Sequence, residues 1–160
     1  VWNNATAFAL KDANLGNPRA LETWMRIGKA KSVGEVEAAV SETLGIPWVN
    51  TIVADRHGDA LHADVTAVPN VSAVLIAECK TPISGLFAAN ATLIDGSRAA
   101  CDWQAAPGTP VPGLMPASDQ ASTTRRDYLT NSNDSYWIAN PRIPQAARSP
   151  VLGPHASALT

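Results

Sequence analysis

The segment 46–64 constrains the fold of this chain more than any other stretch. A β-rich apolar run ends at Val53, a polar cluster surrounds Gly58, and an alternating run of residues leads on to Asp64. Two strand-like runs on either side of a short polar loop with a glycine are typical of a β-hairpin. We therefore predict a hairpin that lies in or beside the core.

Asn50 is the notable residue of this hairpin, because its amide stands among the apolar neighbours Val49, Ile52 and Val53. A buried amide that finds no hydrogen-bond partner costs about 1–3 kcal/mol. Asn50 is therefore either bonded within the fold or directed at a ligand. The residue pattern alone favours the first of these roles.

Two helices are predicted upstream of the hairpin, after a short strand over residues 6–11. Asn17 followed by Pro18 favours a helix start, with Leu21, Trp24 and Met25 on an inward face. A second helix begins at Ser32, where Glu35 completes a capping box, and ends at Gly45. Its inward positions are Val33, Val36, Val40 and Leu44.

The chain changes character after the hairpin. Residues 71–79 fit a helix or a strand equally well, and proline and glycine recur from Pro82 to Pro116. This composition predicts ordered loops with short strands over residues 67–160. So long a loop-rich stretch is unusual in a free-standing domain, so we expect it to wrap around further polypeptide.

Charge and hydropathy exclude two classes of partner. The net charge of −2 over 160 residues provides no basic surface for nucleic acid. No apolar run approaches the ~20 residues that span a bilayer. We therefore expect neither a nucleic-acid partner nor a membrane partner.

The hairpin also carries residues of the types that bind metals. These are His57, His62, Asp55, Asp59 and Asp64. Acids at a hairpin tip are ordinary turn residues, and the spacing is not that of a zinc site. A Ser-His-Asp triad lacks the glycine-flanked serine that would support it. We predict neither a metal site nor a triad.

Cys79 and Cys101 are the two cysteines of the chain. They are too few for a disulfide scaffold and lack zinc-type spacing. The residues alone leave a single bridge and two buried thiols as equal alternatives.

Three motifs together resemble the penicillin acylase family of N-terminal nucleophile hydrolases. The first is the stretch 45–55, Gly-Ile-Pro-Trp-Val-Asn-Thr-Ile-Val-Ala-Asp. The second is the turn 95–98 followed by Cys-Asp-Trp at 101–103, and the third is the polar-aromatic run 131–141. The branch that these motifs resemble contains acyl-homoserine-lactone acylases and aculeacin-type acylases, and the match is to an internal part of their β chain.

This resemblance implies a fold and a cellular location. The chain is expected to be an α+β segment of the four-layer αββα fold, with residues 1–66 forming the strand, two helices and hairpin, and residues 67–160 the wrap. Because such acylases are exported bacterial enzymes, the resemblance implies a periplasmic or secreted protein and favours a Cys79–Cys101 bridge. It implies no redox or organic cofactor. Some relatives bind a structural calcium, whose ligands do not map onto this sequence.

The resemblance also implies an activity and site residues. Members hydrolyse N-acyl compounds such as acyl-homoserine lactones, lipopeptide antibiotics or β-lactams. Asn50 matches the asparagine of the oxyanion hole, the group of donors that stabilises the negative oxygen of the tetrahedral intermediate. Arg98 is a candidate for orienting Asn50 or for contacting a polar part of the substrate, beside a structural role in holding its turn through bonds to carbonyl groups.

The nucleophile of the family is an N-terminal serine, whereas residue 1 of this chain is Val1. We therefore expect the serine on remaining acylase chains or fragments, and we expect this segment alone to be inactive.

A second hypothesis comes from a different class of protein. The five tryptophans could form the surface of a secreted, non-catalytic binding module, although core packing accounts for them better. Burial of Trp48, Trp103 and Trp137 beside Asn50 would exclude this module, and an open row of them would favour it.

Overall fold

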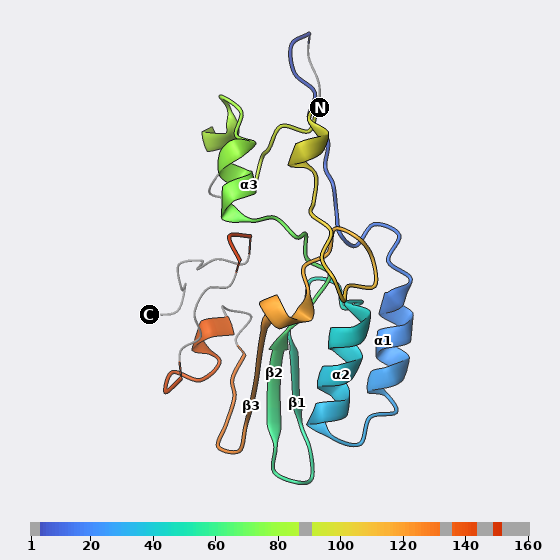
Figure 1. Ribbon diagram of the computed structural model, residues 1–160. Coiled ribbons are helices and arrows are strands. Elements are labelled where there is room, and N and C mark those ends of the chain that lie inside the picture. The colour runs from blue at the N-terminus through green and yellow to red at the C-terminus, as the bar shows by residue number, and fades with distance from the viewer. Residues whose placement is uncertain (1–3, 87–90, 132–135, 144–148, 152–160) are drawn as a thin grey trace.

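A computed structural model describes residues 4–86, 91–131, 136–143 and 149–151 (Figure 1). The described part contains helices and one antiparallel sheet, which confirms the α+β prediction. Its helices and strands are α1 (Arg19–Ile27), α2 (Val33–Thr43), β1 (Thr51–Ala54), β2 (Ala60–Asp64), α3 (Ala73–Glu78) and β3 (Ala121–Arg125). Its 3₁₀ turns are η1 (Ser84–Leu86), η2 (Ala99–Cys101), η3 (Ala117–Asp119) and η4 (Tyr136–Ile138).

The predicted hairpin is confirmed as β1 and β2. Thr51 pairs with Ala63 at one end of this ladder, and Ala54 pairs with Ala60 next to the turn. β3 extends the sheet in the order β1-β2-β3, with Asp64 paired to Ala121. The sequence analysis missed β3, because only its first residue is apolar and its partner lies some sixty residues away.

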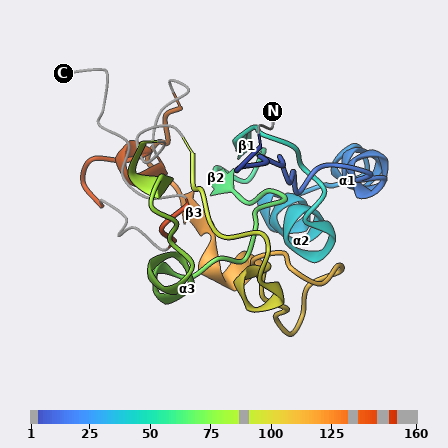
Figure 2. The same cartoon turned by 90° about the horizontal axis from the view of Figure 1, so that it is seen from above.

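The elements form layers in the order α1, α2, sheet and η4 (Figure 2). Leu61 and Ala63 of β2 belong to the same core as Val36 and Val40 of α2. Since side chains alternate along a strand, His62 and Asp64 lie on the opposite face of the sheet. That face is where η4 packs (Figure 2).

The Ser32 cap and the inward face predicted for α2 are confirmed, but the predicted capping box is not, because Glu35 bonds the amide of Lys31 instead of that of Ser32. The Glu35 amide donates to the Ser32 hydroxyl at 3.2 Å, and the Glu35 carboxylate accepts from the Lys31 amide at 2.7 Å. Its end was predicted wrongly: the helix stops at Thr43, and Leu44 takes the left-handed conformation with φ 44°. The inward positions Val33, Val36, Val40 and Leu44 are all buried.

Gly45 is needed for a close approach between the two helices rather than for a cap. A Cβ at this position would lie 2.3 Å from Thr23 Oγ1 and 2.6 Å from the Arg19 carbonyl carbon. Backbone atoms cannot move aside as the end of a flexible side chain can. A larger residue would therefore push α1 away from the end of α2.

The predicted inward face of α1 is wrong. Leu21, Trp24 and Met25 are all more than half exposed. The buried residue is Thr23, whose hydroxyl lies 2.6 Å from that of Thr43. Polar side chains thus join α1 to α2, so the apolar spacing does not report the contact.

The predicted cap of α1 also differs from the structure. No side chain caps this helix. The side-chain amide of Asn17 donates instead to the Gly45 carbonyl at 3.1 Å. The Arg19 guanidinium donates to the Thr43 carbonyl at 2.9 Å, close to the end of α2. Both contacts tie the start of α1 to the chain that leaves α2.

Two further predictions concern the segments before α1 and after the hairpin. Residues 6–11 do not form the short strand that was predicted, and the undecided segment 71–79 contains the helix α3. The described residues of the loop-rich half contain α3, β3 and four 3₁₀ turns. Among the described residues, no helix has the length and apolarity that a bilayer crossing demands.

Candidate functional site

Asn50 lies directly before β1, at the end of the hairpin that is remote from the turn. Ile52, two residues on, pairs with His62, so Asn50 falls on the sheet face that turns away from α2. The side chain is partly exposed and makes no hydrogen bond to any described residue. No described residue occupies its amide donors, so they are available to a ligand.

A cavity of about 300 Å³ opens beside Asn50. Most of its wall is apolar, and its polar groups come from the hairpin and the residues that follow it. The described residues that line it are Trp48, Asn50, Asp64, Thr66, Ala67, Val68, Pro69 and Val151. An apolar wall with a few convergent polar groups is the usual form of a small-molecule site.

Asp64 stands across the ladder from Asn50. The last recorded pair is Thr51 with Ala63, and the next step along both strands leads to Asn50 and Asp64. Burial raises the pKa of the Asp64 carboxyl group, and no described cation or donor opposes this effect. Asp64 therefore brings an incompletely solvated carboxylate to the same cavity.

Trp48 forms the outer wall of the cavity. Its side chain is 76% exposed, and its backbone is left-handed with φ 54°. A bulky residue seldom adopts this conformation, which costs of order 1–2 kcal/mol and which clusters at functional sites. The neighbouring Val49 and Ile52 are each about half exposed, so the apolar surface continues along β1.

The hairpin turn is held from two sides. Burial alone would raise the pKa of Asp55, but the amides of Val33, His57 and Asp59 donate to its carboxylate and lower the pKa overall. Arg126 donates to the Asp59 carboxylate at 2.8 Å. These acids therefore serve the turn, as predicted.

His57 and His62 do not come together as a metal site. His57 is exposed in the turn, whereas His62 is only 1% exposed in the middle of β2. Burial lowers the pKa of His62, and its Nδ1 atom has no hydrogen-bond partner among the described residues. Across the described ranges, no three histidine, cysteine or acidic side chains form a group that could hold a metal ion.

Gln120 supports the cavity and was missed by the sequence analysis. Its side chain is 2% exposed and bonds both the amide and the carbonyl group of Thr66, at 2.8 and 3.1 Å. It also donates to the Met115 carbonyl at 3.1 Å. Gln120 thus fixes one wall of the cavity, and its partner Thr66 lies 54 residues away, too far along the chain for a local pattern to reveal the contact.

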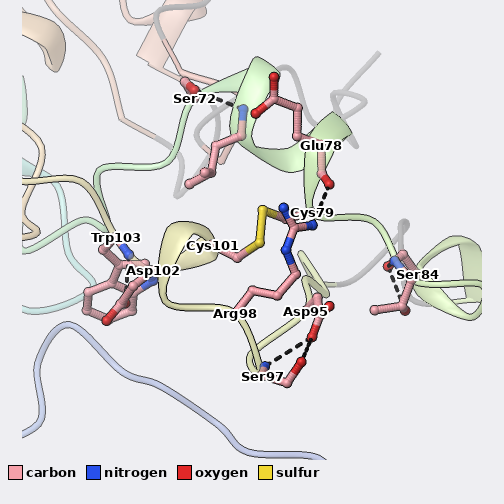
Figure 3. Close-up of a disulfide and its surroundings, with 12 residues drawn as sticks. Ser72, Glu78, Cys79, Ser84, Asp95, Ser97, Arg98, Cys101, Asp102 and Trp103 are labelled. Atoms are coloured by element: carbon pink, nitrogen blue, oxygen red, sulfur yellow. Dashed lines mark hydrogen bonds between the residues drawn. A yellow bond between two sulfur atoms is a disulfide. The ribbon is translucent and has the colours of Figure 1, made fainter.

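Arg98 lies in a different part of the molecule, beside the Cys79–Cys101 disulfide (Figure 3). Its guanidinium donates to the Glu78 carbonyl at 3.1 Å, and it does not line the cavity of Asn50. This contact is the structural role that the sequence analysis allowed, a bond to a carbonyl group. The role of orienting Asn50 or contacting substrate stays a prediction without support from this placement.

The bridge itself resolves the alternative that the cysteine spacing left open. Cys79 and Cys101 are bonded to each other, and both are almost fully buried. Val71 and Leu75 are the other buried members of the group, and Val151 packs against it. We call Val71, Leu75, Cys79 and Cys101 the disulfide cluster.

The described tryptophans are neither all buried beside Asn50 nor all exposed in one open row. Neither test of the binding module is therefore met. Trp48 is exposed, while Trp103 is partly buried against the disulfide cluster with Lys11 Nζ 4.3 Å from its ring centroid. Trp24 is half exposed, so the prediction that it packs in the core is wrong. The side chain of Trp137 lies outside the described residues.

Comparison with known proteins places these features in a family. The penicillin amidase family model matches residues 1–155. Acyl-homoserine lactone acylase PvdQ of Pseudomonas fluorescens is 40% identical over 151 residues, which cover 94% of this chain and 19% of the relative. Aculeacin-A acylase of Actinoplanes utahensis is 41% identical over 154 residues, which cover 95% of this chain and 20% of the relative.

The chain spans about a fifth of the length of these curated relatives. The match nonetheless includes the hairpin, the cavity and the disulfide cluster in one continuous alignment over nearly all of the 160 residues. It confirms the resemblance that the three motifs carried. The chain belongs to the penicillin amidase family.

Proposed function

We propose that this chain is part of an acylase that hydrolyses the amide bond of N-acyl compounds. The observation that carries the proposal is the Asn50 amide, which faces a cavity with apolar walls in a chain that the penicillin amidase model matches from residue 1 to 155. The names of the relatives indicate acyl-homoserine lactones and the lipopeptide aculeacin A as substrate types. β-Lactams are a third candidate class.

In this proposal Asn50 is a donor of the oxyanion hole. Attack on the acyl carbon converts the carbonyl oxygen into an oxyanion, and a donor aimed at that position lowers the barrier by about 2.7–4 kcal/mol. The Asn50 side chain is suited to this task because it sits at the end of a paired strand, where the backbone is fixed. Its lack of a described partner leaves the donors open.

The remaining catalytic groups belong, in this proposal, to the rest of the acylase. An N-terminal serine attacks the acyl carbon while its own α-amino group takes the hydroxyl proton. The C–N bond then breaks, the nitrogen receives that proton, and water releases the acid from the serine ester. The α+β segment would form part of the four-layer αββα fold, with the exposed apolar face of β1 covered by the other layers.

We also propose a periplasmic or secreted location. The Cys79–Cys101 disulfide supports it, because such bonds persist in oxidising compartments.

The test is reconstitution of amide hydrolysis. This chain is combined with the acylase polypeptide that begins with serine, and the mixture is incubated with acyl-homoserine lactones, a lipopeptide and a β-lactam. The proposal expects release of free amine and a transient mass increase of one acyl group on the serine-bearing polypeptide, both dependent on this chain. Hydrolysis that proceeds equally well without this chain would refute its role.

A further inference from the structure

The cavity beside Asn50 holds a pair of groups that amide hydrolysis itself does not require. Asp64 presents a carboxylate, and Trp48 presents an exposed indole ring, to the same 300 Å³ space. Neither group is needed to stabilise an oxyanion, and a carboxylate near that oxygen would oppose its charge. We therefore expect Trp48 and Asp64 to have a role other than stabilising the oxyanion.

The surroundings of Asp64 show what it lacks. A carboxylate that is partly removed from water needs a cation or hydrogen-bond donors to offset the cost of desolvation. No described cation or donor provides this compensation, and burial is the single cause of the shift in its pKa. By contrast, Asp55, Asp59 and Asp127 all accept hydrogen bonds from described donors. Asp64 thus lines the cavity without a hydrogen-bond donor among the described residues.

Trp48 adds the complementary chemistry. An indole ring attracts ammonium groups through its face, and more strongly where the cation is desolvated. The left-handed backbone holds this ring at the cavity at a conformational cost. An aromatic ring and a carboxylate around one space form the usual receptor for an organic cation.

The two halves of an amide substrate differ in how they suit this receptor. An apolar acyl chain laid against Asp64 would remove its remaining water and give nothing in return. The scissile nitrogen is an uncharged amide in the substrate, but a second amino group on the amine half is protonated at neutral pH, because the pKa of alkylamines is near that of lysine, about 10. An amine half that carries such a group therefore fits beside Asp64.

We propose that Trp48 and Asp64 form a subsite that favours substrates whose amine half carries a positive charge. The inference rests on the proposed acylase function and adds the class of leaving group to it. Asn50 binds the carbonyl oxygen at the end of β1, and the charged amine half extends toward Asp64 on β2. The acyl chain then occupies space outside these two residues.

The experiment compares two substrates of equal length in the complete acylase. One is decanoyl-1,4-diaminobutane, with a free ammonium group, and the other is decanoyl-pentylamine, which is neutral. We expect kcat/KM to be about tenfold higher for the charged substrate in wild type. Asp64→Asn removes this preference, so that the ratio of the two kcat/KM values falls to about one.

Matched variants separate this effect from general damage. Trp48→Phe keeps the preference and Trp48→Leu weakens it, because only the first retains an aromatic face. Asp119→Asn, at an exposed acid in η3 outside the cavity, leaves the preference unchanged. An equal kcat/KM for the two substrates in wild type, or a preference that survives Asp64→Asn, overturns the proposal.

Failure of the acylase function would give a different result. In that case neither substrate is hydrolysed. Calorimetry with pentylammonium and 1-pentanol then tests cation binding at the subsite independently of catalysis. Binding of pentylammonium that is lost in Asp64→Asn, without binding of the alcohol, supports the subsite. Equal binding of both probes, or of neither, refutes it.

Discussion

The helix and sheet layers bury ten apolar residues in one core, whereas the disulfide cluster buries two apolar side chains around one covalent bond. Asn50 lies at the end of β1 in the layers, while Arg98 bonds the Glu78 carbonyl beside the disulfide cluster. We infer that the two regions have different structural roles. In the proposed acylase the packed layers would hold Asn50 at the end of a paired strand, and the disulfide fixes a loop-rich flank that has little core of its own.

Gly45→Ala should produce the largest loss of stability, and it tests whether the layers depend on packing. The added Cβ would lie within 2.6 Å of the Arg19 backbone, so α1 must move away from α2. We expect the free energy of unfolding to fall by about 3 kcal/mol or more. Chemical denaturation measures this, with Gly85→Ala as the control, because a Cβ there would meet nothing within 4 Å.

Replacing both Cys79 and Cys101 by alanine should have a more local effect. The bridge links two residues with a sequence separation of 22. The chain entropy of the unfolded state predicts that loss of the bridge lowers the free energy of unfolding by roughly 3 kcal/mol. Hydrogen exchange should quicken in α3 and η2 and stay unchanged in β1 and β2. Equal loss of protection in the sheet would contradict the separation of the two regions.

His62 should make the sheet sensitive to acid. Burial lowers its pKa in the folded chain from the ordinary value of 6.5, so the unfolded chain binds the proton first as the pH falls. Stability should therefore decline as the pH drops below about 6.5, until the lowered folded pKa is passed. His62→Phe should flatten this part of the curve of thermal midpoint against pH, and His57→Gln in the exposed turn should not.

Local signals in the sequence were sufficient for part of the fold. Ser32 and Glu35 lie within one helical turn, and the hairpin joins neighbouring strands, so short-range rules predicted both. The same holds for the inward face of α2, which is apolar. These elements are the ones in which propensity and burial agree.

Other features depended on contacts between distant residues. The face of α1 was predicted wrongly because Thr23 and Arg19 join it to α2 through polar bonds. β3 and Gln120 gain their roles only from partners on other elements. The role proposed for Asn50 came from the family motif, whereas Asp64 was noted only among possible metal ligands, because nothing local shows that its strand position reaches the cavity.

The most direct test of the account is the single-turnover acylation rate of the complete acylase with Asn50→Ala and, in parallel, Arg98→Ala. Asn50→Ala should lower this rate by about 10²–10³-fold, with KM little changed, because the oxyanion forms only during the reaction. Arg98→Ala should leave the rate within about twofold of wild type, since its guanidinium bonds a carbonyl beside the disulfide. A wild-type rate in Asn50→Ala, or an equally large loss in Arg98→Ala, would contradict the assignment of the chemistry to the hairpin.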